Sequence, residues 1–226
     1  MVKGKRKRHG GREQKSGGPC AFLGAAAGIA GALFVISLSV IIILNLRPLY
    51  VSDIGRFQIE AESGMDRETI LRNYDALIRY NRLCFRGPLE FPDLPMSASA
   101  RIHFEEVKRI FDFIQILCPA AGLLFACGVI SRRQRKRTLK TAGISLFALM
   151  ALLGVLALGG WERFFVGFHQ LFFHNDYWLF DPVTDPVILL LPDGYFLHCA
   201  VGIAALCAAG AALCLAFGRR ARGGVS

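Results

Sequence analysis

The sequence predicts an all-α integral membrane protein with four transmembrane helices. Of its 226 residues, 54% are hydrophobic and only 19% are charged. The apolar residues are collected into four long runs that contain no charged side chain. These runs are residues 21–46, 113–131, 141–161 and 194–218. Each is close to the roughly 20 residues that a helix needs to cross the hydrocarbon core of a bilayer.

The charges between these runs predict how the chain is oriented. The short segments 1–20, 132–140 and 219–226 together carry 16 Lys or Arg and one acid, whereas the longer segments 47–112 and 162–193 carry 11 Lys or Arg and 16 acids. Positively charged loops stay on the cytoplasmic side of a membrane. We therefore expect both termini to be cytoplasmic and the two longer segments to be extracytoplasmic, in a single membrane domain spanning 1–226. The same rule accounts for the basic tail, so no nucleic-acid partner is predicted.

The two outer segments are predicted to be partly helical. Apolar residues recur at helical spacing between residues 66 and 83, and prolines at 92 and 95 predict a loop after it. Ser97 or Ser99 is placed to cap a further helix that continues into the run 113–131. In the second segment, aromatic residues repeat at helical spacing from Trp161 to Phe172, which indicates an amphipathic helix in the outer headgroup region.

The histidines of the outer segments are the side chains best suited to chemistry. His103, His169 and His174 lie there, and imidazole exchanges protons near neutral pH. Residue types alone leave three interpretations open. In the first, a histidine pair performs acid–base or nucleophilic catalysis on a lipid. In the second, His103 and Glu106, three residues apart on a helix, form a metal site together with His169 and His174. In the third, the protein is a non-catalytic membrane scaffold, and its histidines are interfacial hydrogen-bonding groups. No standard hydrolase or nucleotide-binding motif is present.

Three stretches are similar to a bacterial family of four-helix membrane proteins that includes the lipoprotein intramolecular transacylases. They are NYDALIRY (residues 73–80), IHFEEVKRIF (residues 102–111) and FHQLFFHNDYWLFDPVTDPVILLLPDGYF (residues 168–196). The resemblance covers the topology from the first to the fourth spanning run. It is strongest in the second outer segment, where several motifs follow in the order typical of the family.

This resemblance implies an acyltransferase of the bacterial cytoplasmic membrane, with its active site on the extracytoplasmic face. Its partners would be membrane phospholipid and lipoproteins whose N-terminal cysteine carries a diacylglyceryl group. The fatty acid at the sn-2 position would move to the α-amino group of that cysteine and leave a lyso-form lipoprotein. Because donor and acceptor belong to one molecule, the resemblance implies no cofactor and no metal.

The resemblance also implies which residues form the site. The two histidines that match the family pattern are His103 and His169, and they are the predicted catalytic pair. We expect one to act as the base towards the α-amine, His103 in the first assignment, and the other to donate a proton, with the reverse assignment open. Glu106 and Asp185 are expected to orient the imidazoles. The other supporting positions are Asn175, Trp178 and Asp181.

The depth of His103 raises a geometric question. A helix that continued straight outward from Phe113 would place His103, ten residues away, about 15 Å above the hydrocarbon edge. That is too high for a lipid ester. We therefore expect residues 101–112 to tilt or to lie along the interface.

Overall fold

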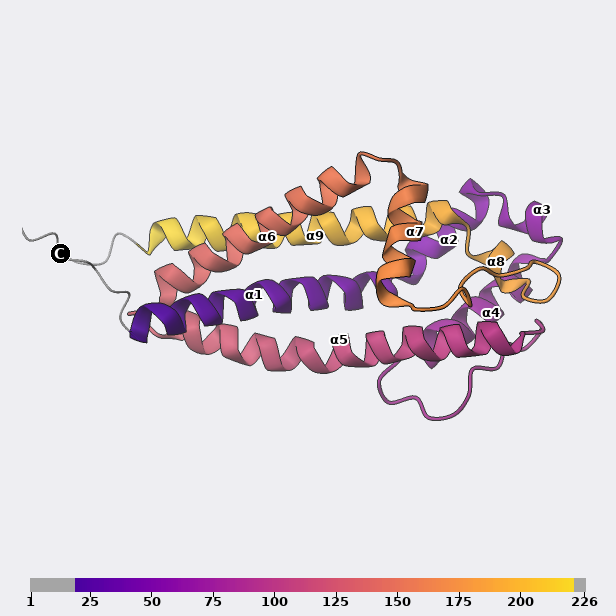
Figure 1. Cartoon of the computed structure of the whole chain (residues 1–226), viewed down its shortest axis with the longest axis horizontal. Helices are drawn as coiled ribbons and strands as arrows, with labels where there is room; N and C mark the ends of the chain where they lie inside the picture. The colour runs from indigo at the N-terminus through magenta and orange to yellow at the C-terminus, as the bar shows by residue number, and fades with distance from the viewer. Residues whose placement is uncertain (1–18, 222–226) are drawn as a thin grey trace, which may run out of the picture.

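The computed structural model describes residues 19–221, and within that range the chain forms nine helices (Figure 1). They are α1 (Pro19–Leu44), α2 (Arg47–Arg56), α3 (Ile59–Ser63), α4 (Arg67–Tyr80), α5 (Ala98–Ile130), α6 (Arg135–Ala157), α7 (Trp161–Phe172), α8 (Val187–Leu190) and α9 (Asp193–Arg220). Most of the predicted N-terminal tail, residues 1–18, and the end of the C-terminal tail lie outside the described residues.

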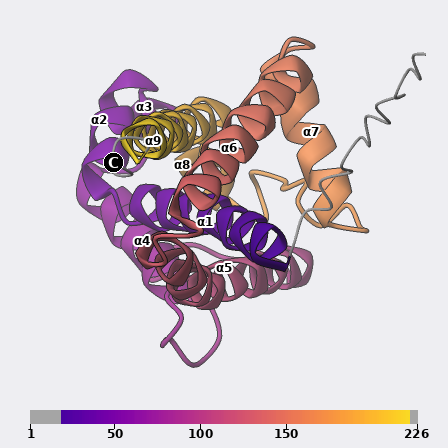
Figure 2. The same ribbon diagram turned by 90° about the vertical axis from the view of Figure 1, so that its left-hand side faces the viewer.

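Four of these helices, α1, α5, α6 and α9, are long and apolar enough to cross a membrane. They contain almost all of the four predicted spanning runs, although α6 ends at Ala157 and the break at Gly159 and Gly160 starts before the predicted end at residue 161. The helix α1 lies inside the bundle, where it packs against α5, α6 and α9 (Figures 1 and 2). The described ends of the chain lie together at one end of the bundle, and the shorter helices cover the other end (Figure 1).

Small residues allow the spanning helices to approach one another closely. A Cβ atom placed on Gly28 of α1 would lie 2.5 Å from the Cβ of Thr141 and 2.7 Å from the carbonyl oxygen of Thr138, both on α6. A Cβ on Gly128 of α5 would lie 2.5 Å from the Cβ of Ala27. Helices in lipid associate largely through such close backbone packing, because lipid supplies no hydrophobic force between them.

The short helices form a cap with a hydrophobic core of its own. Tyr50 of α2 stacks on Tyr74 of α4, with ring centroids 3.6 Å apart, and both rings meet the edge of Tyr195 at the start of α9. The hydroxyl of Tyr50 donates to the carbonyl oxygen of Leu190, so α8 is joined to the same core. This core holds α2, α4, α8 and the outer end of α9 in one unit.

The two predicted helix starts in the first outer segment agree with the structure. Asp66 caps α4 by accepting a hydrogen bond from the backbone N–H of Thr69, and Ser97 caps α5 by accepting one from Ala100. The expectation that residues 101–112 lie along the interface was wrong, while a tilt of this segment to the membrane stays a prediction. These residues form the outer part of the uninterrupted helix α5 and do not turn along the interface (Figure 1). The Ser97 cap starts one 33-residue helix that joins the two predicted parts and runs on through Pro119.

The close contact at Gly28 leads to a prediction about stability. We expect Gly28→Ala to lower the free energy of unfolding by about 1–3 kcal/mol, because its methyl group would collide with the backbone of α6. Gly154→Ala is the matched control in another spanning helix, since a Cβ there meets no atom within 4 Å. Thermal unfolding of both variants in the same lipid or detergent measures the difference. Equal midpoints for the two variants would contradict the predicted close contact.

Candidate active site

His103 lies in the second turn of α5, outside the apolar run that begins at Phe113, and its side chain is buried. The start of α5 is tied to the segment that follows α7. The backbone N–H of Ser97 donates to the carboxylate of Asp185 at 2.6 Å, and the hydroxyl of Thr184 donates to the same carboxylate at 2.9 Å. Asp185 is itself 3% exposed. These bonds fix the first turn of α5, and with it the position of His103.

His169 lies near the end of α7, which runs across the outer end of the bundle rather than along it (Figure 1). None of the residues of α7 is fully buried. Its aromatic face packs on the cap through Phe165, whose ring centroid lies 5.5 Å from that of Phe196 on α9. An amphipathic helix of this kind is suited to lie in the headgroup region with its apolar face towards the bundle and lipid.

The structure brings the two predicted histidines together. Their ring centroids are 6.0 Å apart. The ring of Phe173 packs against both, at 4.6 Å from His103 and 5.7 Å from His169. Phe180 covers His103 at 5.5 Å, and Trp178 stacks on His169 at 4.7 Å. The two imidazoles therefore share a small aromatic enclosure.

This enclosure controls the charge of both imidazoles. Burial, together with a smaller effect of the neighbouring His169, lowers the pKa of His103 to about 4. Burial also lowers the pKa of His169, while its hydrogen bond to Phe165 and the charge of Asp193 act in the opposite direction. Burial has this effect because an apolar environment disfavours the charged imidazolium. Both histidines are therefore predominantly neutral at pH 7.

The hydrogen bonds of the two rings differ. The Nδ1 atom of His169 lies 2.8 Å from the carbonyl oxygen of Phe165. A carbonyl oxygen only accepts, so Nδ1 carries the proton and Nε2 of the neutral ring has a free lone pair. The Nδ1 atom of His103 is buried and has no hydrogen-bond partner among the described residues. A buried polar atom without a partner is costly, which suits a group that receives its partner from a substrate.

The three predicted supporting acids stabilise the segment that follows α7. In the described structure none of them forms a hydrogen bond with His103 or His169. The carboxylate of Glu106 accepts from the side-chain amide of Asn175 at 3.0 and 3.3 Å. The indole of Trp178 donates to the backbone carbonyl of Asn175 at 3.1 Å and stacks on His169. Glu106 therefore acts on His169 through two intermediaries. Asp181 stabilises a turn by accepting from the backbone N–H of Val183.

The sequence interpretation missed several neighbours of the pair. Phe173 and Phe180 enclose His103, but they cannot be told from the other phenylalanines of this aromatic segment by sequence alone. The contact with the Phe165 carbonyl could have been predicted from the sequence, since Phe165 lies one helical turn before His169. A second pair was also missed: Nδ1 of His198 on α9 lies 2.9 Å from both carboxylate oxygens of buried Asp53 on α2. This pair belongs to the packing of the cap.

The metal alternative required His103, Glu106, His169 and His174 to converge. In the structure His174 is exposed and Glu106 is bonded to Asn175. Across residues 19–221, no three His, Cys, Asp or Glu side chains are grouped as they would be around a metal ion.

Comparisons with known proteins decide the family. The model of the family described as lipoprotein intramolecular transacylase Lit matches residues 26–196, which include both histidines and all the predicted supporting residues. The chain belongs to the lipoprotein intramolecular transacylase family. It is therefore an acyltransferase. No curated protein matches the chain significantly.

Solved structures of this transacylase family agree with the fold. The chain is similar to the membrane-integral lipoprotein intramolecular transacylase Lit from Bacillus cereus, with 32% sequence identity and a TM-score of 0.86 over 92% of this chain and 97% of that one. Two further structures are of the same Bacillus cereus protein with a single histidine replaced, by arginine or by alanine. Each is 32% identical and has a TM-score of 0.80, over 90% of this chain and 92% or 93% of the other.

Burial of His103 in this transacylase predicts how its ring titrates. We expect the imidazole of His103 to remain neutral down to about pH 4. By contrast, a histidine in an unfolded chain has a pKa near 6.5. The unfolded state then binds more protons between these two values, so the free energy of unfolding falls as the pH is lowered from about 6.5 towards 4. NMR titration of ring-labelled histidine follows the pKa, with His103→Asn used to assign the signal. A His103 signal that titrates near pH 6.5 would rule out the desolvated site.

Proposed function

We propose that this transacylase moves the sn-2 fatty acid of a diacylglyceryl-cysteine to the α-amino group of the same cysteine, using His103 and His169. Membership of the family supports acyl transfer within a lipoprotein. The observation that supports this site is the pair of neutral imidazoles, 6.0 Å apart in an aromatic enclosure at the outer end of the bundle.

The hydrogen bonds favour the reverse of the first assignment of roles. His169 is the better base, because its Nδ1–H is held by the Phe165 carbonyl and its Nε2 lone pair is available to take a proton from the α-amine. His103 has the lower pKa and is the weaker base. In its neutral form it still has one N–H group, which is suited to donate to the oxyanion that develops on the ester carbonyl.

The reaction balances within one substrate molecule. The cysteine nitrogen attacks the ester carbon, a C–N amide bond forms, and the C–O bond to the glyceryl oxygen breaks. The proton lost by the amine passes through the imidazole pair to the departing glyceryl oxygen. No water or second substrate enters, so much of the rate enhancement comes from holding amine and ester together.

Apolar side chains around the pair offer a route for the acyl chains to reach it. Ile102 is 41% exposed beside His103, and Phe168, Leu171 and Phe172 on α7 are 44%, 71% and 48% exposed. Because residues 101–112 continue the helix α5, His103 lies beyond the apolar run of its own helix. The exposed apolar surface of α7 extends from the bundle to the pair, and we propose that acyl chains lie along it while the ester is at the imidazoles.

We propose that this site faces the extracytoplasmic side of the cytoplasmic membrane, with both termini inside. The excess of Lys and Arg in segments 1–20, 132–140 and 219–226 supports this orientation. Cys84 is exposed in the loop after α4, at the capped end of the bundle. In intact bacterial cells we expect a membrane-impermeant maleimide to label Cys84, and to label a cysteine introduced by Ser226→Cys only after lysis. The opposite pattern would place the site on the cytoplasmic side.

The activity is tested on a synthetic diacylglyceryl lipopeptide with a free α-amine. We expect the purified protein to leave the total mass unchanged and to move one acyl chain from the glyceryl fragment to the amino-terminal fragment, as read by tandem mass spectrometry. Release of free fatty acid would show hydrolysis instead. A lipopeptide that binds and returns unaltered would support the scaffold interpretation.

Variants assign the roles. We expect His103→Asn and His169→Asn each to lower kcat by at least about 100-fold, within the usual range for loss of an acid–base group, while the thermal unfolding midpoint is retained. Glu106→Ala should lower kcat by about ten-fold, since it removes one charge-assisted hydrogen bond that positions Trp178 and His169. Glu106→Gln keeps an oxygen that accepts from Asn175 and should restore most of that loss. Full activity of either histidine variant would contradict the proposed pair.

A further inference from the structure

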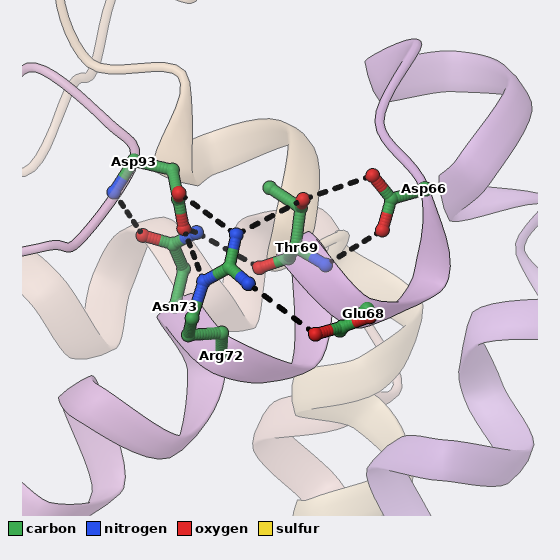
Figure 3. Close-up of polar contacts among 6 residues, drawn as sticks. All are labelled: Asp66, Glu68, Thr69, Arg72, Asn73 and Asp93. Atoms are coloured by element: carbon green, nitrogen blue, oxygen red, sulfur yellow. Dashed lines mark hydrogen bonds and ion pairs between the residues drawn. The ribbon is translucent and has the colours of Figure 1, made fainter.

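The loop that follows α4, residues 82–97, is fastened to α4 by a polar network (Figure 3). The guanidinium of Arg72 donates two hydrogen bonds to the carboxylate of Asp93, at 2.9 and 2.8 Å. The side-chain amide of Asn73 donates to the same carboxylate at 2.8 Å, and the carbonyl of that side chain accepts from the backbone N–H of Asp93. Asn73 is fully buried. These hydrogen bonds hold the loop in a defined position against α4.

Two adjoining hollows lie between this loop and the exposed face of α4. One has a volume of about 450 Å³, and its lining includes the rings of Tyr80, Phe85 and Phe91. The other has a volume of about 740 Å³ and is lined largely by charged side chains of α4. Both are bordered by Ala76, Arg79 and Pro92. Because the two hollows share this border, we call them together the α4 groove.

The α4 groove has an excess of basic side chains. Its walls carry four arginines and three acids, namely Arg47, Arg67, Arg72 and Arg79 with Glu68, Asp75 and Glu90. Arg47 is bonded to Asp75 through two nitrogens, and Arg72 is bonded to Asp93. Arg79, at the junction of the two hollows, is exposed and has no ion-pair partner among the described residues. This guanidinium is therefore available to form an ion pair with a carboxylate bound in the groove.

The end of the groove at Phe91 is connected to the catalytic pair through aromatic rings in edge-to-face and tilted contact. Phe91, on the groove wall, contacts Phe104 with ring centroids 5.8 Å apart, and the centroid of Phe104 lies 6.0 Å from that of His103. Phe180 contacts both Phe104 and His103. Two aromatic side chains, Phe104 and Phe91, therefore separate His103 from the groove.

The direction of α4 excludes a lipid headgroup from most of the groove. The C-terminal end of α4 lies beside the spanning part of α5, because Gln115 donates to the carbonyl of Asn81 and accepts from the backbone N–H of Leu83. The helix runs outward from there, and Arg67 is twelve residues away from Arg79, or about 18 Å along the axis. An extended peptide covers that length with about five residues.

We propose that the α4 groove binds the polypeptide segment just after the lipidated cysteine of the substrate, and that Arg79 favours an acidic side chain in it. This inference rests on the proposed function, because it needs the acyl acceptor to be the first residue of a protein. The substrate's polypeptide must leave the imidazole pair and reach water. The groove begins two rings from His103, runs away from the bilayer and has the length of about five extended residues.

The experiment compares three lipopeptides with the same lipid and the same cysteine. One ends directly after the cysteine, and the other two carry five further residues, either acidic or basic. For the wild-type protein we expect kcat/KM for the acidic lipopeptide to exceed that for the basic one by roughly three- to ten-fold, the size of effect expected for exposed charge pairs. We expect Arg79→Glu to invert this ratio.

The matched control is Arg56→Glu. Arg56, like Arg79, is an exposed arginine in the last turn of its helix, but it lies on α2 and outside the groove. We expect this variant to leave the ratio of acidic to basic lipopeptide unchanged. Thermal unfolding of both variants shows whether charge reversal at the end of a helix has itself altered the fold.

Two results would overturn the inference while leaving the proposed function intact. One is equal kcat/KM for the acidic and basic lipopeptides in the wild-type protein. The other is an effect of Arg79→Glu that is the same for all three lipopeptides and grows with the fraction of anionic phospholipid in the bilayer, which would assign the groove to a lipid headgroup. Failure of the proposed function is distinguishable, since then no lipopeptide, the shortest included, undergoes acyl migration.

Discussion

The site depends on how the segment after α7 is attached to the first turns of α5. Helix α7 buries none of its side chains fully, so packing alone holds it weakly across the end of the bundle. Two carboxylates compensate for this. Asp185 accepts from the backbone N–H of Ser97, and Glu106 accepts from Asn175, so the segment is bonded to α5 on both sides of His103. Among the described residues, these are the side-chain hydrogen bonds that join this segment to α5.

This arrangement differs from a catalytic triad, in which a carboxylate contacts the imidazole and raises its basicity. Here aromatic rings surround the imidazoles, and burial keeps both of them neutral. A neutral pair suits an ester aminolysis at neutral pH, because one ring has a lone pair to accept a proton and the other has an N–H group to donate. Glu106 and Asp185 position the segment after α7, because their carboxylates accept hydrogen bonds from a side-chain amide and a backbone N–H group.

The cap has a second role beside positioning the pair. The stacked tyrosines at 50 and 74 and the buried Asp53–His198 pair join helices from distant parts of the chain. The loop of residues 82–97 is then fastened to α4 and forms the wall of the groove beside the site (Figure 3). The same unit therefore supports the two histidines on one side and carries on the other the groove in which we propose that the substrate's polypeptide binds.

Several features followed from local rules and could be predicted from the sequence. The uncharged runs predicted the spanning helices, because hydrocarbon excludes charge from the helix centre. Apolar spacing predicted the helix that starts after Asp66, and Ser97, one of the two serines named as a cap, predicted the start of α5, because a cap is a contact between residues three apart. The helices α2 and α3 were not predicted, since their apolar positions are buried against residues far along the chain and show no clear period of their own.

By itself the sequence determined that the chain is a bundle of four apolar helices, and its motifs pointed to the two histidines and to the transacylase family. Only the tertiary structure decided that the rings lie 6.0 Å apart, that Glu106 is bonded to Asn175 rather than to an imidazole, and that residues 101–112 continue the helix α5. The physical reason is sequence separation. His103 and His169 are 66 residues apart in the sequence, and their distance is set by how α7 and the following segment pack on α5, which no local pattern encodes.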